Sequence, residues 1–144
     1  MTTFATFLGS AGEFPLKSLP FFLERVSAGF PSPAQDYVDR ALDLNELCIQ
    51  RPAATFFVRA QGESMIEAGI FPDDVLVVDR SLTARSGDVV IAQFYGELTV
   101  KQLQLGNPPQ LLPCNHRMQP IQVPPDADLE ILGVVTHVIH SLRK

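Results

Sequence analysis

The sequence predicts a mainly β fold, in which an antiparallel sheet rolls into a barrel-like body behind a short N-terminal arm and helix. From Ala54 onward, seven short runs rich in β-branched and apolar residues are separated by turn residues, a pattern typical of strands. Tyr95-Gly96-Glu97 joins two of these runs as a tight hairpin, with glycine supplying the unusual backbone angles. Many short strands and few helices therefore favour a rolled antiparallel sheet.

The seven runs are the expected strands of this sheet. They are Thr55 to Arg59, Val75 to Asp79, Asp88 to Phe94, Leu98 to Leu105, Gln110 to Leu112, Ile121 to Val123 and Ile131 to Ser141. We find no internal repeat and no low-complexity tract in the chain. The runs are therefore expected to form a single body.

The segment before the strands is expected to begin with an arm. Residues 1–15 have weak periodicity and small or polar side chains, which predicts a flexible arm. Leu16 to Val26, interrupted by Pro20, is expected as an extended arm or a single helical turn. Two prolines and a glycine keep Ser27 to Pro33 out of regular structure.

Helical signals follow this irregular stretch. Ser32 and Pro33 suit the N-cap and the first position of a helix, and apolar residues then recur at helical spacing. A second helix or a continuation is expected from Asp43, as its cap, to Gln50, with Pro52 ending it. This helical stretch would separate the arm from the β body.

Composition and charge exclude several classes of protein. A chain of 144 residues that is 46% hydrophobic and 19% charged fits about one globular domain. It has no apolar run long enough for a membrane span and no secretory signal, so we expect a cytoplasmic location. The net charge of −5, with its longest basic cluster at Arg143-Lys144, argues against direct nucleic-acid binding.

The two cysteines give no sign of a metal or redox site. Cys48 and Cys114 form no CxxC pair and no metal-ligand spacing with the three histidines. We therefore expect two reduced thiols, one on a helix and one in a loop, and neither a metal nor another cofactor.

A serine and a lysine are the candidates for catalysis. Ser64 follows Gly62 and lies between an apolar run and a turn-rich stretch, where a loop presents a hydroxyl at the end of a strand. Lys101 lies in a strand pattern on the same face as Leu103 and Leu105. Burial among apolar side chains disfavours the charged form of a lysine, and a neutral lysine can take the proton of a serine.

The residues alone leave a different catalytic arrangement open. Glu63 is a carboxylate beside Ser64, but neighbours on a strand or tight loop point apart, so we assign it no catalytic role. A Ser-His-Asp triad is the alternative to the lysine. It would draw on His137 or His140, which follow Asp126 and Asp128.

Several motifs together resemble the LexA-type self-cleaving serine peptidases, family S24. They are Gly62-Glu63-Ser64-Met65, Asp73 to Asp79, Gly87 to Ala92, Thr99-Val100-Lys101, Ala28 to Ala34, Asp43 to Leu47 and Leu132 to Val135. Within that family the chain most resembles the mutagenesis proteins of the bacterial SOS response. The resemblance covers roughly residues 16–143, and the order of the motifs is more specific than any one of them.

The resemblance implies an active site and a reaction. Ser64 is then the nucleophile and Lys101 the general base of a serine endopeptidase that cuts its own chain. The bond between Ala28 and Gly29 is the implied cleavage site. The backbone N–H groups of Ser64 and Glu63 are the expected oxyanion donors.

The resemblance also implies domains and partners. Self-cleavage would remove an arm, residues 1–28, from a peptidase domain, residues 29–144. The family implies a homodimer, stimulation of cleavage by RecA on single-stranded DNA, and a trimmed form that joins an error-prone translesion polymerase of the UmuC type. About 30 residues precede Gly29, which is too few for the DNA-binding domain of a LexA-type repressor. A polymerase accessory subunit that never cuts itself and a peptidase acting on other proteins are the alternatives.

Overall fold

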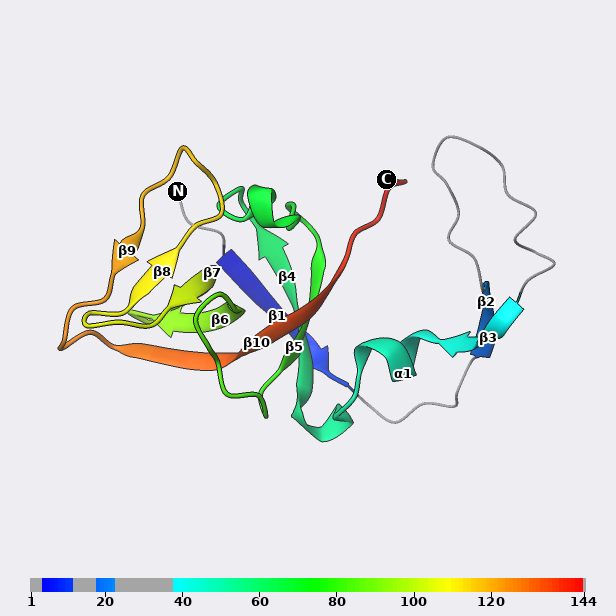
Figure 1. Cartoon of the computed structure of the whole chain (residues 1–144). Coiled ribbons are helices and arrows are strands. Elements are labelled where there is room, and N and C mark those ends of the chain that lie inside the picture. The colour runs from blue at the N-terminus through cyan, green and yellow to red at the C-terminus, as the bar shows by residue number, and fades with distance from the viewer. Residues whose placement is uncertain (1–3, 12–17, 23–37, 144) are drawn as a thin grey trace. The chain divides into compact units, whose positions relative to one another are not determined.

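The computed structural model describes residues 4–11, 18–22 and 38–143, and it divides the chain into two compact units (Figure 1). Residues 13–50 form the smaller unit, and residues 1–12 with 51–144 form the larger one. The expected cleavage site, Ala28–Gly29, and the expected helix cap at Ser32 lie outside the described residues.

The larger unit is built on one antiparallel sheet of eight strands. The strands are β1 (Phe4–Ser10), β4 (Thr55–Gln61), β5 (Val75–Asp79), β6 (Val89–Phe94), β7 (Glu97–Gln104), β8 (Gln110–Leu112), β9 (Ile121–Gln122) and β10 (Leu129–Ile139). Their order is β1-β4-β5-β10-β6-β7-β8-β9, and β1 also pairs with β7 through Phe4 and Thr99. That extra pairing closes the sheet from β1 round to β7, which confirms the expected rolled, barrel-like fold.

All seven expected strands are present, and their ends differ from the expectation by no more than two residues. The hairpin between β6 and β7 is also confirmed, because Phe94 pairs with Glu97 across it. Its two central residues, Tyr95 and Gly96, have φ angles of 50° and 83°. Positive φ at both positions suits the twist of a two-residue hairpin.

The first strand was not expected from the sequence. Residues 1–15 are predicted as a flexible arm, which is wrong for Phe4–Ser10, because these residues form β1 along the edge of β4. The register runs from Phe4 opposite Gln61 to Ser10 opposite Phe56, with an irregularity between Phe7 and Gly9. The local pattern is weak, so this strand owes its form to a partner more than 45 residues away along the chain.

The smaller unit pairs two strands, β2 (Ser18–Phe22) and β3 (Val38–Asp43). An extended segment was one of the two forms expected for residues 16–26, and β2 confirms it for Ser18–Phe22. Helical spacing before residue 43 was misleading, because Val38–Asp43 is a strand. A few apolar residues at helical spacing do not nucleate a helix when a strand partner is available.

One expected helix is confirmed at its cap. Helix α1 (Leu44–Cys48) begins after Asp43, whose Oδ1 accepts a hydrogen bond of 2.8 Å from the backbone N–H of Asn45. The side chain of Asp43 thus satisfies one of the donors that a helix leaves unpaired at its start. A 3-10 turn, η2 (Pro52–Ala54), follows before β4.

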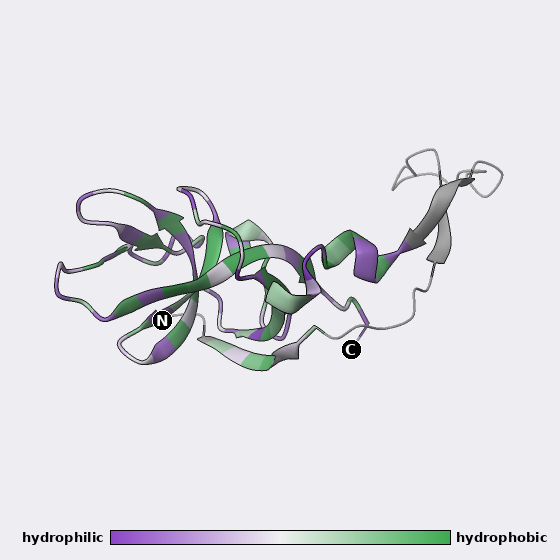
Figure 2. Ribbon diagram, turned by 90° about the horizontal axis from the view of Figure 1, so that it is seen from below, coloured by the Kyte–Doolittle hydropathy of each residue, from purple (hydrophilic) through white to green (hydrophobic). Residues whose placement is uncertain are grey.

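Two apolar clusters fill the sheet, and hydrophobic stretches run along its strands in Figure 2. The larger cluster consists of Phe56, Val58, Ala60, Met65, Ile70, Leu76, Val78, Ile91 and Val100. The second consists of Val90, Ala92, Leu103, Leu111, Val123 and Val134. Strand β7 contributes Val100 to the first and Leu103 to the second, so its centre lies in the interior.

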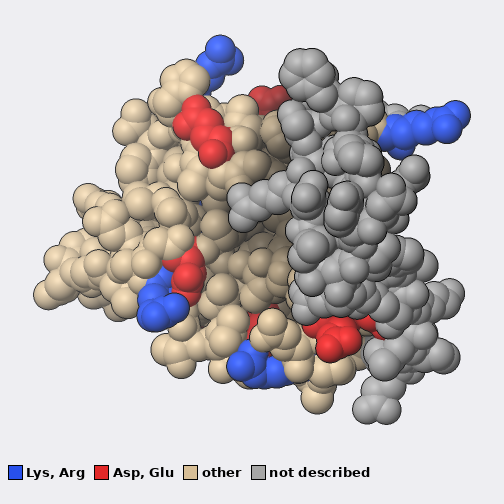
Figure 3. Space-filling view, turned by 45° about the vertical axis from the view of Figure 1, so that its right-hand side comes forward, with Lys and Arg blue, Asp and Glu red and all other residues tan. Residues whose placement is uncertain are grey.

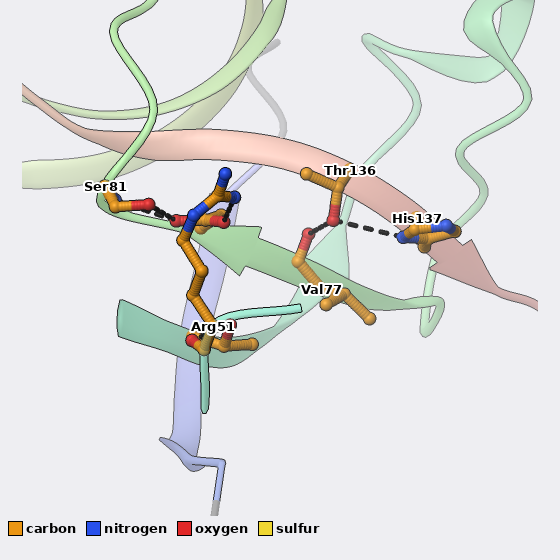
Figure 4. A network of polar contacts seen from close by, with 7 residues as sticks. Arg51, Val77, Ser81, Thr136 and His137 are labelled. Carbon is orange, nitrogen blue, oxygen red and sulfur yellow. Dashed lines mark hydrogen bonds and ion pairs between the residues drawn. The ribbon is translucent and has the colours of Figure 1, made fainter. Parts of the chain in front are cut away.

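A buried carboxylate ties the chain before β4 to the end of β5. Asp79 is 5% exposed, and its Oδ2 accepts a hydrogen bond of 3.0 Å from Arg51 Nη1 (Figure 4). Its Oδ1 accepts from the backbone N–H and the hydroxyl of Ser81, at 2.8 and 2.6 Å. Burial alone would raise the pKa of Asp79, but the hydrogen bonds from Ser81 and Arg51 hold it below its ordinary value.

Candidate active site

The loop after β4 carries Ser64 into the interior. Gly62 has a φ of 86°, a conformation that glycine adopts without strain, and it turns the chain where β4 ends. Met65 is 0% exposed and belongs to the larger core cluster, so it anchors the loop from the next position. Ser64 itself is 0% exposed, and the 3-10 turn η3 (Ile66–Ala68) follows. The hydroxyl is thus held inside the body by a neighbour that packs in the core.

Lys101 reaches the serine from the centre of β7. It is 2% exposed, and its Nζ lies 3.0 Å from Ser64 Oγ. The same nitrogen donates to Thr99 Oγ1 at 2.9 Å and to the carbonyl oxygen of Val100 at 3.1 Å. The structure therefore brings together the serine and the lysine that the sequence singled out.

Burial sets the charge state of this lysine. It lowers the pKa of Lys101 to about 8 from an ordinary value of 10.5, and Cys114 opposes the shift weakly. When protonated, the ammonium has one N–H for each of its three oxygen partners. After losing a proton it keeps two donors. Because the Val100 carbonyl can only accept, the lone pair then faces a hydroxyl, that of Ser64 or Thr99.

The expected face of β7 is confirmed around the lysine and wrong at its end. Leu103 is 3% exposed, as expected for a residue that shares a face with a desolvated lysine. Leu105 is 56% exposed, because β7 ends at Gln104 and the chain leaves the sheet there. Desolvation of Lys101 therefore comes from the middle of the strand.

A second loop, residues 113–118, fixes the peptide that precedes Ser64. Asn115 is 6% exposed, and its Nδ2 donates a hydrogen bond of 2.9 Å to the carbonyl oxygen of Glu63. The backbone N–H of Glu67 donates to the Cys114 carbonyl at 2.8 Å, which binds the two loops a second time. In a trans peptide the C=O and the next N–H point in opposite directions. Asn115 therefore sets the direction of the Ser64 N–H, an expected oxyanion donor.

Sequence reasoning missed two polar residues of this site. Thr99 lies two positions before Lys101 on a strand, and the alternation of β residues placed both on one face without suggesting a role. Asn115 is 52 residues from Glu63, and no local pattern links them. The side chain of Glu63 is exposed, in keeping with the absence of an assigned catalytic role.

The histidines have partners other than the serine in the contacts that the structure describes. His140 pairs with Asp74, His116 with Glu67, and His137 Nδ1 lies 3.1 Å from Thr136 Oγ1 (Figure 4). Among the described residues, Asp126 and Asp128 pair with none of the three histidines. These contacts give the Ser-His-Asp alternative no support.

The two thiols lie on a helix and in a loop, as the sequence predicts. Cys48 at the end of α1 and Cys114 in a loop are both free cysteines. On the face shown in Figure 3 the blue side chains stand apart from one another and form no basic patch. The described residues contain no group of three or more His, Cys, Asp or Glu arranged to hold a metal. None of the described helices is long and apolar enough to cross a membrane.

Comparison with known proteins places this chain in a family. The family model described as Peptidase S24-like matches residues 20–136. The chain belongs to the Peptidase S24-like family. Membership makes it a serine protease of the self-cleaving kind, as the motifs around Ser64 and Lys101 led us to expect.

Similar proteins show which members of the S24 family this chain resembles. Protein ImpA of Escherichia coli is 52% identical over 125 residues, 87% of this chain and 86% of the relative. Protein MucA of Escherichia coli is 49% identical over 129 residues, 89% and 88% of the two chains. Both are UmuD-like proteins of SOS mutagenesis, which confirms the expected resemblance.

A repressor of the same family is more distant and longer. The LexA repressor of Alcanivorax borkumensis is 41% identical over 119 residues, which are 81% of this chain but 57% of the repressor. The S24 peptidase described here therefore shares its peptidase region with a repressor and most of its length with the SOS mutagenesis proteins.

Proposed function

We propose that this S24 peptidase cuts its own chain between Ala28 and Gly29, with Ser64 as nucleophile and Lys101 as general base. One observation carries the proposal: Lys101 Nζ lies 3.0 Å from Ser64 Oγ, with both side chains buried. The lowered pKa of Lys101, about 8, supports it, because an appreciable fraction of the lysine is neutral near neutral pH.

The chemistry follows from these positions. Neutral Lys101 takes the proton of Ser64, and Oγ attacks the carbonyl carbon of Ala28. The backbone N–H groups of Ser64 and Glu63 stabilise the oxyanion that forms. The intermediate collapses as the Lys101 ammonium gives its proton to the departing nitrogen of Gly29. Water, activated by the regenerated amine, then hydrolyses the acyl-enzyme and releases residues 1–28.

The relatives support a wider role for the product. We infer that residues 29–144 are the working form, a cytoplasmic homodimer that serves as accessory subunit of a UmuC-type translesion polymerase. We also infer that RecA on single-stranded DNA stimulates the cut. The support is the identity of about half of the residues to the UmuD-like proteins ImpA and MucA.

Intact mass tests the cleavage directly. The purified chain is incubated at about pH 10, where most lysines with a pKa near 8 are neutral, beside Ser64→Ala and Lys101→Ala. A new species that begins at Gly29, in the unsubstituted chain alone, is the expected result. An unchanged mass, also with RecA filaments present, would leave the accessory subunit that never cuts itself as the better account.

A further inference from the structure

Strand β1 completes the sheet, but it lies on the N-terminal side of the proposed cleavage site. It pairs with β4 from Phe4 to Ser10 and reaches β7 where Phe4 lies opposite Thr99. Along the chain, β1 is joined to β4 only through residues 11–54. A break after Ala28 would therefore cut the covalent link between this strand and the sheet that it completes.

Strand β1 contacts the rest of the sheet through an aromatic side chain as well as through its backbone. The ring of Phe7 lies 5.7 Å from the ring of Phe56, and Phe7 remains 56% exposed while Phe56 is 6% exposed. A pocket beside this aromatic pair is lined by Phe7, Ser10, Phe56, Arg80 and Leu132. The guanidinium carbon of Arg80 lies 5.8 Å from the centre of the Phe56 ring. Phe7 thus lines this pocket and pairs with an aromatic ring that lies beside a cation.

Severing the chain changes the binding of β1 without changing any of its contacts. A tethered segment meets its site at an effective concentration of roughly millimolar. A free segment meets it only at the concentration of the protein itself, which is far lower. The strand is held by the pairing of its backbone with β4, by the packing of Ala5 against the larger core cluster and by the half-exposed Phe7. Release then follows from mass action once the protein concentration falls below the dissociation constant of the severed segment.

We propose that β1 is an intramolecular plug on the edge of β4. Severing the chain before Gly29 frees this edge. The edge then binds an extended strand of a partner protein, which places an aromatic side chain where Phe7 lies. The trigger rests on the proposed self-cleavage, whereas the release requires only a severed chain. The plug is itself the evidence for the occupant, because β1 shows which strand direction, register and side chain this edge accepts.

The chemistry of the freed edge favours a strand as its ligand. Without β1, the backbone of β4 from Phe56 to Gln61 loses its neighbour on that side. An unpaired edge beside apolar side chains is a template for strand addition. The partner's residue at the place of Thr6 would lie opposite Arg59, which is exposed, so an acidic side chain fits there.

The experiment severs the chain independently of Ser64. A site for a sequence-specific protease is inserted between Ala28 and Gly29 of the full chain that also carries Ser64→Ala. The probe is a fluorescent peptide of residues 1–12, and the control peptide carries Phe7→Ala. Anisotropy reports binding, gel filtration at low concentration reports loss of residues 1–28, and hydrogen exchange reports protection of the β4 amides.

We expect the uncut chain not to bind the peptide, because its own β1 occupies the edge. The severed chain should lose residues 1–28 on dilution, bind the peptide, and bind the Phe7→Ala peptide about tenfold more weakly, as loss of an aromatic pair predicts. Exchange at the β4 amides should speed up on severing and slow again with the peptide.

Several results would overturn the proposal. Residues 1–28 that stay bound at nanomolar concentration would show that severing does not release β1. Equal binding of the peptide to cut and uncut chains would place it elsewhere. If a severed chain does not bind the peptide but its β4 amides stay protected, a second copy of the chain occupies the edge. If exchange becomes fast throughout the sheet, β1 is required for the fold itself. Failure of the natural chain to cut itself would contradict the proposed function alone.

Discussion

Asp79 and Lys101 are both buried, but their surroundings favour the charged form of the first and the neutral form of the second. Asp79 is surrounded by donors, one of them the guanidinium of Arg51, so its charged form is favoured in spite of burial. Lys101 donates hydrogen bonds to three uncharged oxygens, and burial disfavours its charged form. The comparison shows that an ion pair stabilises the structural carboxylate Asp79, whereas Lys101 has no such pair among these contacts and can lose its proton.

The largest effect should come from denying the lysine its neutral form. Lys101→Arg keeps a cation that does not deprotonate in proteins, so self-cleavage should fall by about 10²–10⁴. Asp79→Asn is the matched control, because it changes a buried charge that has no place in the reaction. The measurement is the rate of appearance of the fragment that begins at Gly29. Comparable rates for Lys101→Arg and the unsubstituted chain would refute a lysine base.

Stability should separate the two groups by the sign of the change. Asp79→Ala leaves Arg51 and Ser81 without their acceptor and should lower the free energy of unfolding by about 1–3 kcal/mol at pH 7. Lys101→Met removes a cation that is costly to bury and should raise it by about 1–2 kcal/mol at the same pH. Urea denaturation of both variants measures the difference. Destabilisation by Lys101→Met at pH 7 would show that the ammonium is well compensated.

The sign of the pH dependence of stability sharpens that result. The pKa of Lys101 is about 8 in the folded chain and higher in the unfolded one, so the unfolded chain binds more protons between the two values. The unsubstituted protein should therefore gain stability as pH rises above about 8. The advantage of Lys101→Met should shrink over that range.

The rate of self-cleavage should follow the neutral fraction of the lysine. With a pKa of about 8, roughly one tenth of Lys101 is neutral at pH 7. We expect the rate to rise about tenfold from pH 7 to a plateau above pH 9, and Asp79→Asn to show the same profile. Mass spectrometry of samples quenched across this range gives the curve. A flat profile from pH 6 to 10 would be incompatible with Lys101 as the base.

The smallest effect should come from the residue that orients the serine loop. Asn115→Ala removes the hydrogen bond to the Glu63 carbonyl and with it the fixed direction of the Ser64 N–H. Loss of an oxyanion donor outright costs about 10²–10³, and misdirection should cost less, about three- to tenfold at the plateau. The pH at half-maximal rate should not move, since the lysine is untouched. A shifted midpoint would assign Asn115 to the lysine's environment instead.

The sequence was most informative where local pattern and tertiary structure agree. Strands such as Val75–Asp79 are continuous apolar runs between turns, and alternation along β7 correctly predicts a buried position for Lys101. Helical spacing before Asp43 and the weak pattern of residues 4–10 misled, because distant strands decide both segments. The bond from Asn115 to Glu63 spans 52 residues and has no local signature at all.

The pair between Phe4 and Thr99 has a consequence for how often this protein can act. Thr99 accepts a hydrogen bond from the nitrogen of Lys101. A cut after Ala28 therefore discards Phe4, the residue that pairs with Thr99. Each molecule would dismantle part of its own apparatus in its single reaction. Under the proposed function each chain would react once, so the number of cut chains would count the activating encounters, and only new synthesis would restore the intact form.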